Sequence, residues 1–132
     1  VLAEEFRPKT VACFYVFEHI WEIHKAASTL GNLWQKNPES WVWVATHQNQ
    51  PYHGTENYGD FWRLTAQGLQ RLMTEAGVPD IKVFVLDNTS NPGDILAIRQ
   101  PKTLSWPGEA MSKTVQAVSL STHAPTRWEQ YC

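Results

Sequence analysis

The sequence has few cysteines, no long apolar run and no excess of charge of one sign. Its two cysteines, Cys13 and Cys132, stand far apart in the 132 residues, which excludes a disulfide framework and a cysteine-based metal motif. The longest apolar run, residues 11–17, is too short to span a bilayer. Eleven basic residues face 13 acidic ones, so a broad basic surface for nucleic acid is not expected. We therefore expect a protein of a reduced, soluble compartment, the cytoplasm, with neither membrane nor nucleic acid as a partner.

Two apolar runs rich in β-branched and aromatic residues are separated by an amphipathic segment. Residues 10–17 (TVACFYVF) and 40–45 (SWVWVA) predict strands, the first of them covered on both faces. Strand, helix and strand joined by short links predict a βαβ unit with parallel strands. The expected buried stripe of the intervening helix comprises Ile20, Ile23, Ala27, Leu30 and Trp34.

A second helix and an antiparallel pair of strands are expected in the rest of the chain. Thr65 is placed as an N-cap and Gly77 as the residue that ends this helix. Residues 81–86 and 95–98 predict two neighbouring antiparallel strands, with a run of turn formers between them. The predicted buried stripe of the helix comprises Leu69, Leu72, Met73 and Ala76.

The predicted fold class is α/β, with two parallel strands linked by a helix, followed by a helix and an antiparallel strand pair. Residues 1–100 form this unit. Periodicity fades over residues 101–132, so we expect a C-terminal extension that is extended or partly disordered.

Polar side chains gather where the first two strands end. Glu18 and His19 follow the first strand, and His47 and Asn49 follow the second. Because ligands bind beyond the carboxyl ends of parallel strands, these groups are expected to share one rim of the sheet. The loop that leaves this rim adds His53, Tyr58, Asp60, Trp62 and Arg63.

Each of these residues also has a structural explanation. Glu18 suits the start of a helix, where the helix dipole favours an acid. Asp60 and Arg63 stand three residues apart, and the interpretation that we favour is a local ion pair that orders the loop. Trp62 is more typical of packing than of stacking on a ligand.

Three segments resemble class I S-adenosylmethionine-dependent methyltransferases, which have a Rossmann-like fold. VACFYVFEHI, followed by an amphipathic helix, resembles the family's strand four, which commonly ends in a hydrophobic residue, glutamate and histidine; WVWVATHQNQ resembles strand five. The run YGDFWRLT, ending at Thr65, is similar to an Asp-aromatic-Trp-Arg-Phe-Thr pattern of some members. Gly68-Leu69 and Glu75-Ala76-Gly77 continue that pattern. The resemblance covers about residues 9–100, as strands four to seven of the family.

The resemblance implies the acceptor-side half of a methyltransferase domain. The family's first strand with its glycine-rich loop, and the acid that holds the ribose of the cofactor, have no counterpart in the sequence. S-adenosylmethionine is thus implied as the cofactor, but the sequence offers no residues to bind it, and activity would require a missing N-terminal half. The resemblance places four residues as catalytic groups on the acceptor side: Glu18, His19, His47 and His53. It gives Asn49, Tyr58, Asp60, Trp62 and Arg63 to the acceptor loop; the sequence does not identify the acceptor, for which a small molecule is one candidate.

Without the family's first strand, residues 10–17 would expose a long apolar edge. Such edges recruit other chains, so we expect pairing with another polypeptide or self-association along this strand. The alternative function is a non-catalytic interaction module that kept half of an enzyme fold.

A metal site is a third hypothesis. Class I enzymes that methylate small-RNA 3′ ends use a Glu-x-x-Glu-His motif and a later histidine as ligands. Glu18 and His19 match the final pair and His53 the later ligand, but Tyr15 replaces the first glutamate. Two histidines and a carboxylate would suit Mg²⁺, Mn²⁺ or Fe²⁺. We do not assign a metal ligand from the sequence.

Overall fold

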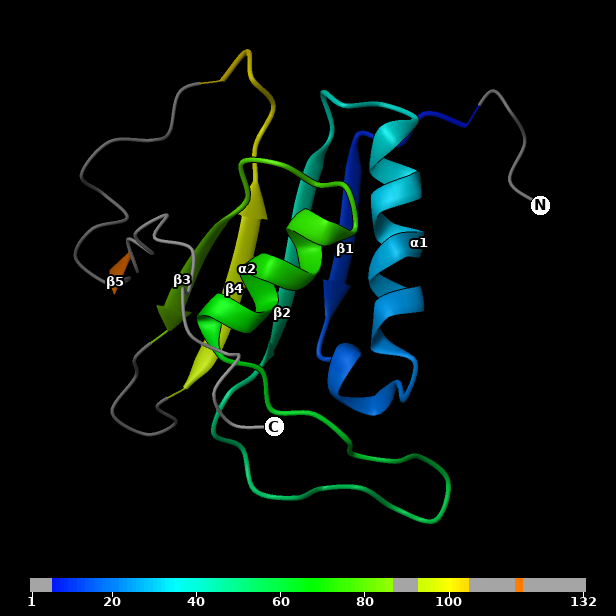
Figure 1. Ribbon diagram of the computed structural model, residues 1–132, viewed down its shortest axis with the longest axis vertical. Helices are drawn as coiled ribbons and strands as arrows, with labels where there is room; N and C mark the ends of the chain where they lie inside the picture. Colours follow the sequence, from blue (N-terminus) through cyan, green and yellow to red (C-terminus); the bar gives the residue numbers. More distant parts are fainter. Residues whose placement is uncertain (1–5, 87–92, 105–115, 118–132) are drawn as a thin grey trace, which may run out of the picture.

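A mixed sheet of order β1-β2-β4-β3-β5 forms the centre of the protein (Figure 1). The structure is a computed structural model that describes residues 6–86, 93–104 and 116–117. The elements in chain order are β1 (Thr10–Phe14), the 3₁₀ helix η1 (Phe17–His19), α1 (Ile23–Gln35), β2 (Trp41–His47), α2 (Ala66–Glu75), β3 (Lys82–Leu86), β4 (Asp94–Arg99) and the two-residue β5 (Gln116–Ala117).

The strand pairing agrees with the predicted α/β class. β1 and β2 are parallel, with Val11 opposite Val42, and α1 links them. β4 lies between β2 and β3 and is antiparallel to both. β1 has β2 as its one neighbour among the described strands and therefore forms an edge of the sheet. The predicted parallel pair and antiparallel pair are confirmed.

Both α-helices cover the same face of the sheet (Figure 1). Alternation along β2 turns Val42 and Val44 into the core beneath the helices and leaves Trp41 and Trp43 on the other face, as predicted. Apart from Ile20, the residues of the predicted apolar stripes contribute to this core, including Ala27 and Leu69. The core therefore lies between one helix layer and one face of the sheet.

The first strand is shorter than the predicted range 10–17. β1 ends at Phe14 because Tyr15 adopts a positive φ of 55°, which a strand does not accommodate. The chain then forms η1, and α1 begins only at Ile23. The prediction that the helix starts directly after the strand, with Ile20 in its stripe, is therefore wrong.

The second helix follows its predicted signals closely. Thr65 caps its N-terminus by accepting a hydrogen bond from the Gly68 backbone N–H, and Gly77 adopts a φ of 88° just past its end. Gly31 of α1 is buried where the two helices meet, and a side chain there would collide with the backbone carbonyl of Ala76. The absence of a side chain at Gly31 is what lets α1 and α2 approach.

Two predictions fall wholly or largely outside the described residues. They concern the turn over residues 87–92 and most of the extension after residue 104, of which only β5 is described. Within the described ranges, no helix combines the length and the apolar character needed to cross a membrane.

Candidate functional site

The carboxyl ends of β1 and β2 bring a buried acid and a histidine together. Glu18 lies in η1 with its side chain fully buried and accepts a hydrogen bond from the Thr46 hydroxyl at 2.8 Å. His47, the last residue of β2, places its Nε2 atom 3.7 Å from Glu18 Oε1. The prediction that these groups share one rim is confirmed. Glu18 also stands in the first turn of a helix, η1, as the helix-start explanation proposed, and burial and the Thr46 hydroxyl hold its carboxylate in addition.

The loop between β2 and α2 folds back onto this rim. The Phe61 backbone N–H donates to the Glu18 carbonyl oxygen at 2.7 Å, and Trp62 Nε1 donates to the Ile20 carbonyl oxygen at 2.9 Å. Trp62 packs against the core and stacks on the exposed Trp21, with ring centroids 5.7 Å apart. Trp62 is therefore a packing residue, as the structural explanation proposed.

Asp60 and Arg63 clamp the loop into one conformation. Two guanidinium nitrogens of Arg63 donate to the two carboxylate oxygens of Asp60, at 2.5 and 2.6 Å, and the His53 backbone N–H donates to Oδ2 at 2.9 Å. Arg63 also donates to the carbonyl oxygens of Gln50 and Pro51. Hydrogen bonds from Arg63 lower the pKa of Asp60 far below its usual value, and Asp60 in turn raises the pKa of Arg63. The predicted ion pair that orders the loop is confirmed.

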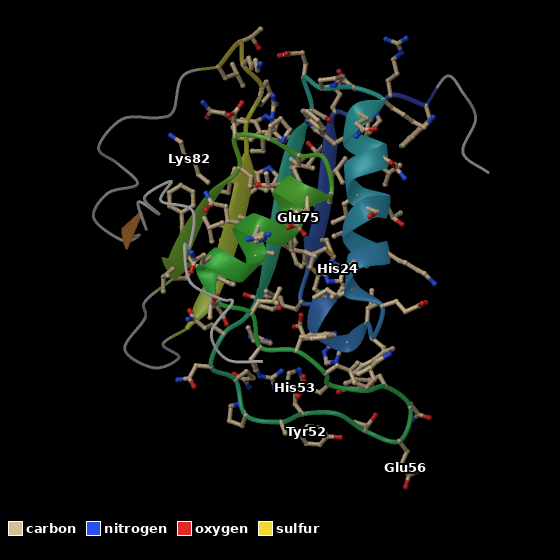
Figure 2. The ribbon with its side chains drawn as sticks, in the orientation of Figure 1. His24, Tyr52, His53, Glu56, Glu75 and Lys82 are labelled. Carbon is tan, nitrogen blue, oxygen red and sulfur yellow. The ribbon has the colours of Figure 1, made fainter. Side chains whose placement is uncertain are left out.

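The clamp holds His53 against His19. Figure 2 shows His53 between the two limbs of the loop, while Glu56 lies at the far end of the loop. His19 Nδ1 lies 2.6 Å from the Gly59 carbonyl oxygen, and His53 Nδ1 lies 3.0 Å from that of Pro51. Because carbonyl oxygens only accept hydrogen bonds, His19 Nδ1 carries hydrogen, whereas His53 Nδ1 has both the Pro51 carbonyl oxygen and, at 3.5 Å, the donor Arg63 Nη2 as neighbours.

When both rings are neutral and both Nδ1 atoms carry hydrogen, the two Nε2 atoms face each other as acceptors. They are 3.2 Å apart, and the rings of His19 and His53 meet edge to face. Two acceptor atoms at this distance repel unless a proton or a cation lies between them. Glu18 adds a buried Oε1 atom that has no hydrogen-bond partner among the described residues. Ligand atoms of Glu18, His19 and His53 all lie within 4.8 Å of one another, so these residues could hold a metal ion.

Tyr15, which directly follows β1, turns away from this group. Its hydroxyl donates to Asp94 Oδ2 at 3.0 Å, and its ring stacks on His47 with centroids 4.6 Å apart. Burial, and then the hydrogen bond to Asp94, raise the pKa of Tyr15. Asp94 Oδ1 lies 2.8 Å from His47 Nδ1, so the ionised carboxylate accepts a hydrogen bond from that nitrogen.

Sequence reasoning missed two residues of the site, Thr46 and Asp94. Thr46 was expected to begin the loop, but it is the sixth residue of β2 and is buried. Asp94 looked like part of a turn, yet it lies opposite His47 in the β2–β4 register. The signal that would have found Asp94 is the pairing of β2 with β4, since an antiparallel partner of β2 places one residue directly opposite His47.

The structure groups the predicted site residues, with one exception. Tyr58 meets the His19 ring edge to face at 4.9 Å and is half exposed. Asn49 is exposed, lies against Gly93, and makes no side-chain hydrogen bond to any described residue. The residues brought together are Glu18, His19, His47, His53, Tyr58, Asp60, Trp62 and Arg63.

Comparison with known proteins adds no relative to this description. No family model, no curated protein and no solved structure matches the chain.

Proposed function

We propose that the chain is the acceptor-side half of a class I S-adenosylmethionine-dependent methyltransferase domain, with a partial Rossmann-like sheet. The single observation that carries the proposal is the loop of residues 48–64, which folds back over the rim where Glu18 and His47 meet. The sequence patterns that resemble the family contribute the residues that hold the loop over the rim. They are Glu18-His19 at the rim and Asp60-Phe61-Trp62-Arg63 in the loop.

The proposed roles follow from how each group is held. Glu18, His19, His47 and His53 line the rim and would position a small-molecule acceptor and accept its proton where the acceptor requires it. Asp60, Trp62 and Arg63 would hold the loop closed over that acceptor.

The described residues do not suit the cofactor. The turn after β1 is Tyr15-Val16, and the turn after β2 is Gln48-Asn49-Gln50-Pro51, so neither supplies the glycine-rich backbone that a nucleoside-bearing cofactor approaches closely. S-adenosylmethionine would therefore be held by residues outside this sequence, on a longer chain or on another polypeptide. β1 is the edge where that chain, or a second copy of this one, would pair.

A chimera tests the proposal. The N-terminal half of a class I methyltransferase domain, cut after its third strand, is fused to residues 9–104. We expect the fusion to bind S-adenosylmethionine and to methylate a small acceptor, and the chain alone to show no cofactor binding by calorimetry. Replacing His47 or His53 by alanine should abolish methylation and leave cofactor binding unchanged. A folded, cofactor-binding fusion whose turnover ignores both replacements would exclude catalysis and favour the non-catalytic interaction module.

A divalent cation site is the second candidate function, favoured by the two Nε2 atoms that face each other beside Glu18. We propose that Mn²⁺, Fe²⁺ or Mg²⁺ between Glu18, His19 and His53 would remove the repulsion between the two imidazoles and give the Glu18 oxygen a partner.

Elemental analysis and Mn²⁺ titration test this second candidate. The expected result is one ion per chain, with binding lost on His53→Ala and kept on the control His24→Ala, since His24 lies on α1 and is exposed. Binding that survives His53→Ala would refute the site.

A further inference from the structure

A second polar feature lies at the opposite end of the sheet from the histidines. β4 runs from Asp94, beside His47, to Arg99, and a cavity of about 200 Å³ opens where it ends. Its charged lining groups are Asp80, Lys82, Arg99 and Lys102.

Arg99 is the unusual member of this group. The residue is 2% exposed, and its guanidinium lies over the Trp34 ring, 4.8 Å from the centroid. Nη1 donates to the Pro38 carbonyl oxygen at 2.8 Å, whereas Nε is buried and has no hydrogen-bond partner in the part of the chain that the structure describes. Among the described residues, no carboxylate lies within ion-pair distance of Arg99.

A buried guanidinium without a counter-charge is unfavourable, because the charge has lost its hydration and gained no anion in exchange. Buried arginines are ordinarily paired with a carboxylate or a phosphate for this reason. Since the chain supplies no such partner in the part that the structure describes, an anion from outside is the simplest group to complete the site.

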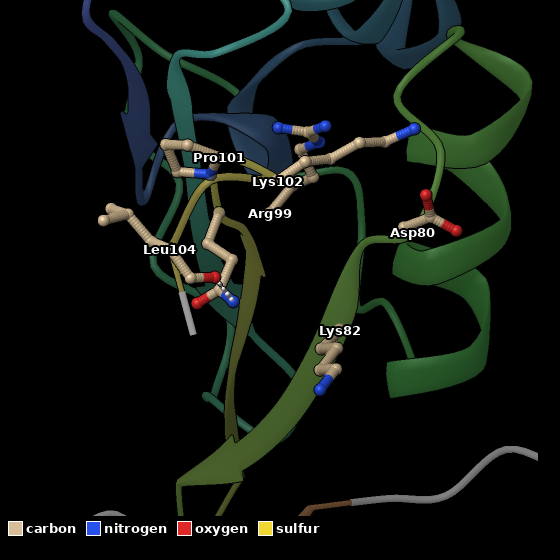
Figure 3. A pocket seen from close by; sticks show the side chains of 7 residues that line it. Asp80, Lys82, Arg99, Pro101, Lys102 and Leu104 are labelled. Atoms are coloured by element: carbon tan, nitrogen blue, oxygen red, sulfur yellow. Dashed lines mark hydrogen bonds between the residues drawn. The ribbon is translucent and has the colours of Figure 1, made fainter. Parts of the chain in front are cut away.

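Lys102 supplies a second cation to the same cavity. Figure 3 shows its side chain extending toward the turn that carries Asp80, on the same wall of the opening as Arg99. Lys102 forms no hydrogen bond or ion pair with any described residue. An arginine fork and a lysine point charge on one wall form a common arrangement for binding the oxygens of a phosphate.

We propose that this cavity binds a phosphate group through Arg99 and Lys102, at a site separate from the histidine cluster. The volume lies below the roughly 300–1,000 Å³ of pockets that enclose drug-sized ligands, so it suits a free phosphate ion or the phosphate of a small ester. Asp80 faces the same cavity and weakens the binding of a dianion by repulsion.

Calorimetry and ³¹P NMR on the full chain test the site, with inorganic phosphate and methyl phosphate as probes and sodium chloride added to keep ionic strength constant. Both probes should saturate, and Lys102→Ala should weaken binding about tenfold. Asp80→Asn should tighten it, because it removes the repulsion and asparagine tolerates the positive φ of 57° at this position. The matched control Lys25→Ala removes an exposed lysine bonded to Glu22 near the start of α1 and should leave binding unchanged.

The two probes also distinguish the sources of the phosphate group. Tighter binding of methyl phosphate identifies an ester as the ligand, and tighter binding of inorganic phosphate identifies the free ion. Binding that does not saturate, or that is equal in the wild type and in Lys102→Ala, would overturn the proposal. Neither Asp80 nor Lys102 belongs to the buried core, so both variants should keep the fold on which the test depends.

Discussion

Replacing Asp60 by alanine should release the loop that closes over the candidate site. The Asp60 side chain is 1% exposed and accepts three hydrogen bonds, from two nitrogens of Arg63 and from the His53 backbone N–H. Removing one partner of a fully buried ion pair costs about 3–5 kcal/mol. The Arg63 side chain is 27% exposed and can recover part of its hydration, so we expect a loss of about 2 kcal/mol.

Thermal unfolding followed by circular dichroism measures this loss. A change of about 2 kcal/mol corresponds to a fall in Tm of about 5–10 °C for a domain of this size. The matched control is Glu75→Ala, which breaks the exposed Arg71–Glu75 pair on α2 and should change stability by less than about 0.5 kcal/mol.

The same carboxylate predicts a pH dependence whose sign is fixed by its pKa. Arg63 lowers the pKa of Asp60 in the folded state below the value of about 3.9 expected in the unfolded chain. The contribution of Asp60 to stability is therefore complete above the unfolded pKa and is lost as the pH falls toward the folded one. Between pH 5 and pH 3 the free energy of unfolding should fall more steeply in the wild type than in Asp60→Asn. Equal slopes, or an unchanged Tm in Asp60→Ala, would refute the inference that this pair holds the loop.

Three further predictions concern the core. Gly31→Ala should destabilise the protein by about 1–3 kcal/mol, because the added methyl group meets the Ala76 carbonyl. Urea unfolding measures this loss, with Ser28→Ala at an exposed position of the same helix as the control. An unchanged midpoint in Gly31→Ala would contradict the tight contact between the helices. Thr46→Val should lower the free energy of unfolding by about 1–3 kcal/mol, because it leaves the buried Glu18 carboxylate without its hydroxyl donor. The control Thr29→Val, on the exposed face of α1, should lower it less. Equal losses of stability in the two variants would argue against the Glu18–Thr46 hydrogen bond. Burial, and then the charge of Glu18, raise the pKa of Cys13 to about 11. In a Cys132→Ser variant, alkylation of Cys13 by iodoacetamide should therefore be slow at pH 8 in the folded protein and fast in guanidinium. Rapid alkylation of the folded protein at pH 8 would contradict this prediction.

Local signals in the sequence predicted the elements that depend on local chemistry. The cap at Thr65, the positive φ of Gly77 and the opposite faces of Trp41 and Val42 follow from rules that involve a few neighbouring residues. The sharing of one rim by Glu18 and His47 also followed, because parallel neighbouring strands end at the same edge.

Features that depend on contacts between distant residues were not predicted. The positive φ of Tyr15, which shortens β1, accompanies a hydroxyl bond to Asp94, 79 positions along the chain. The burial of Glu18 requires Thr46 on another strand, and Asp94 reaches His47 only because β4 lies beside β2. The need for glycine at position 31 arises from the carbonyl of Ala76, which belongs to the end of the other helix.

Because both α-helices lie on one face of the sheet, the other face carries two tryptophans whose spectra can report on its surroundings. Trp41 and Trp43 stack there with centroids 5.5 Å apart and an interplanar angle of 29°, and both are partly exposed. Neighbouring indoles at this separation couple electronically, so their far-ultraviolet circular dichroism should contain a paired signal that either Trp→Phe replacement removes. Their fluorescence should also report water leaving this face. An unlabelled sample can therefore reveal a polypeptide that covers the sheet, before the identity of that polypeptide is known.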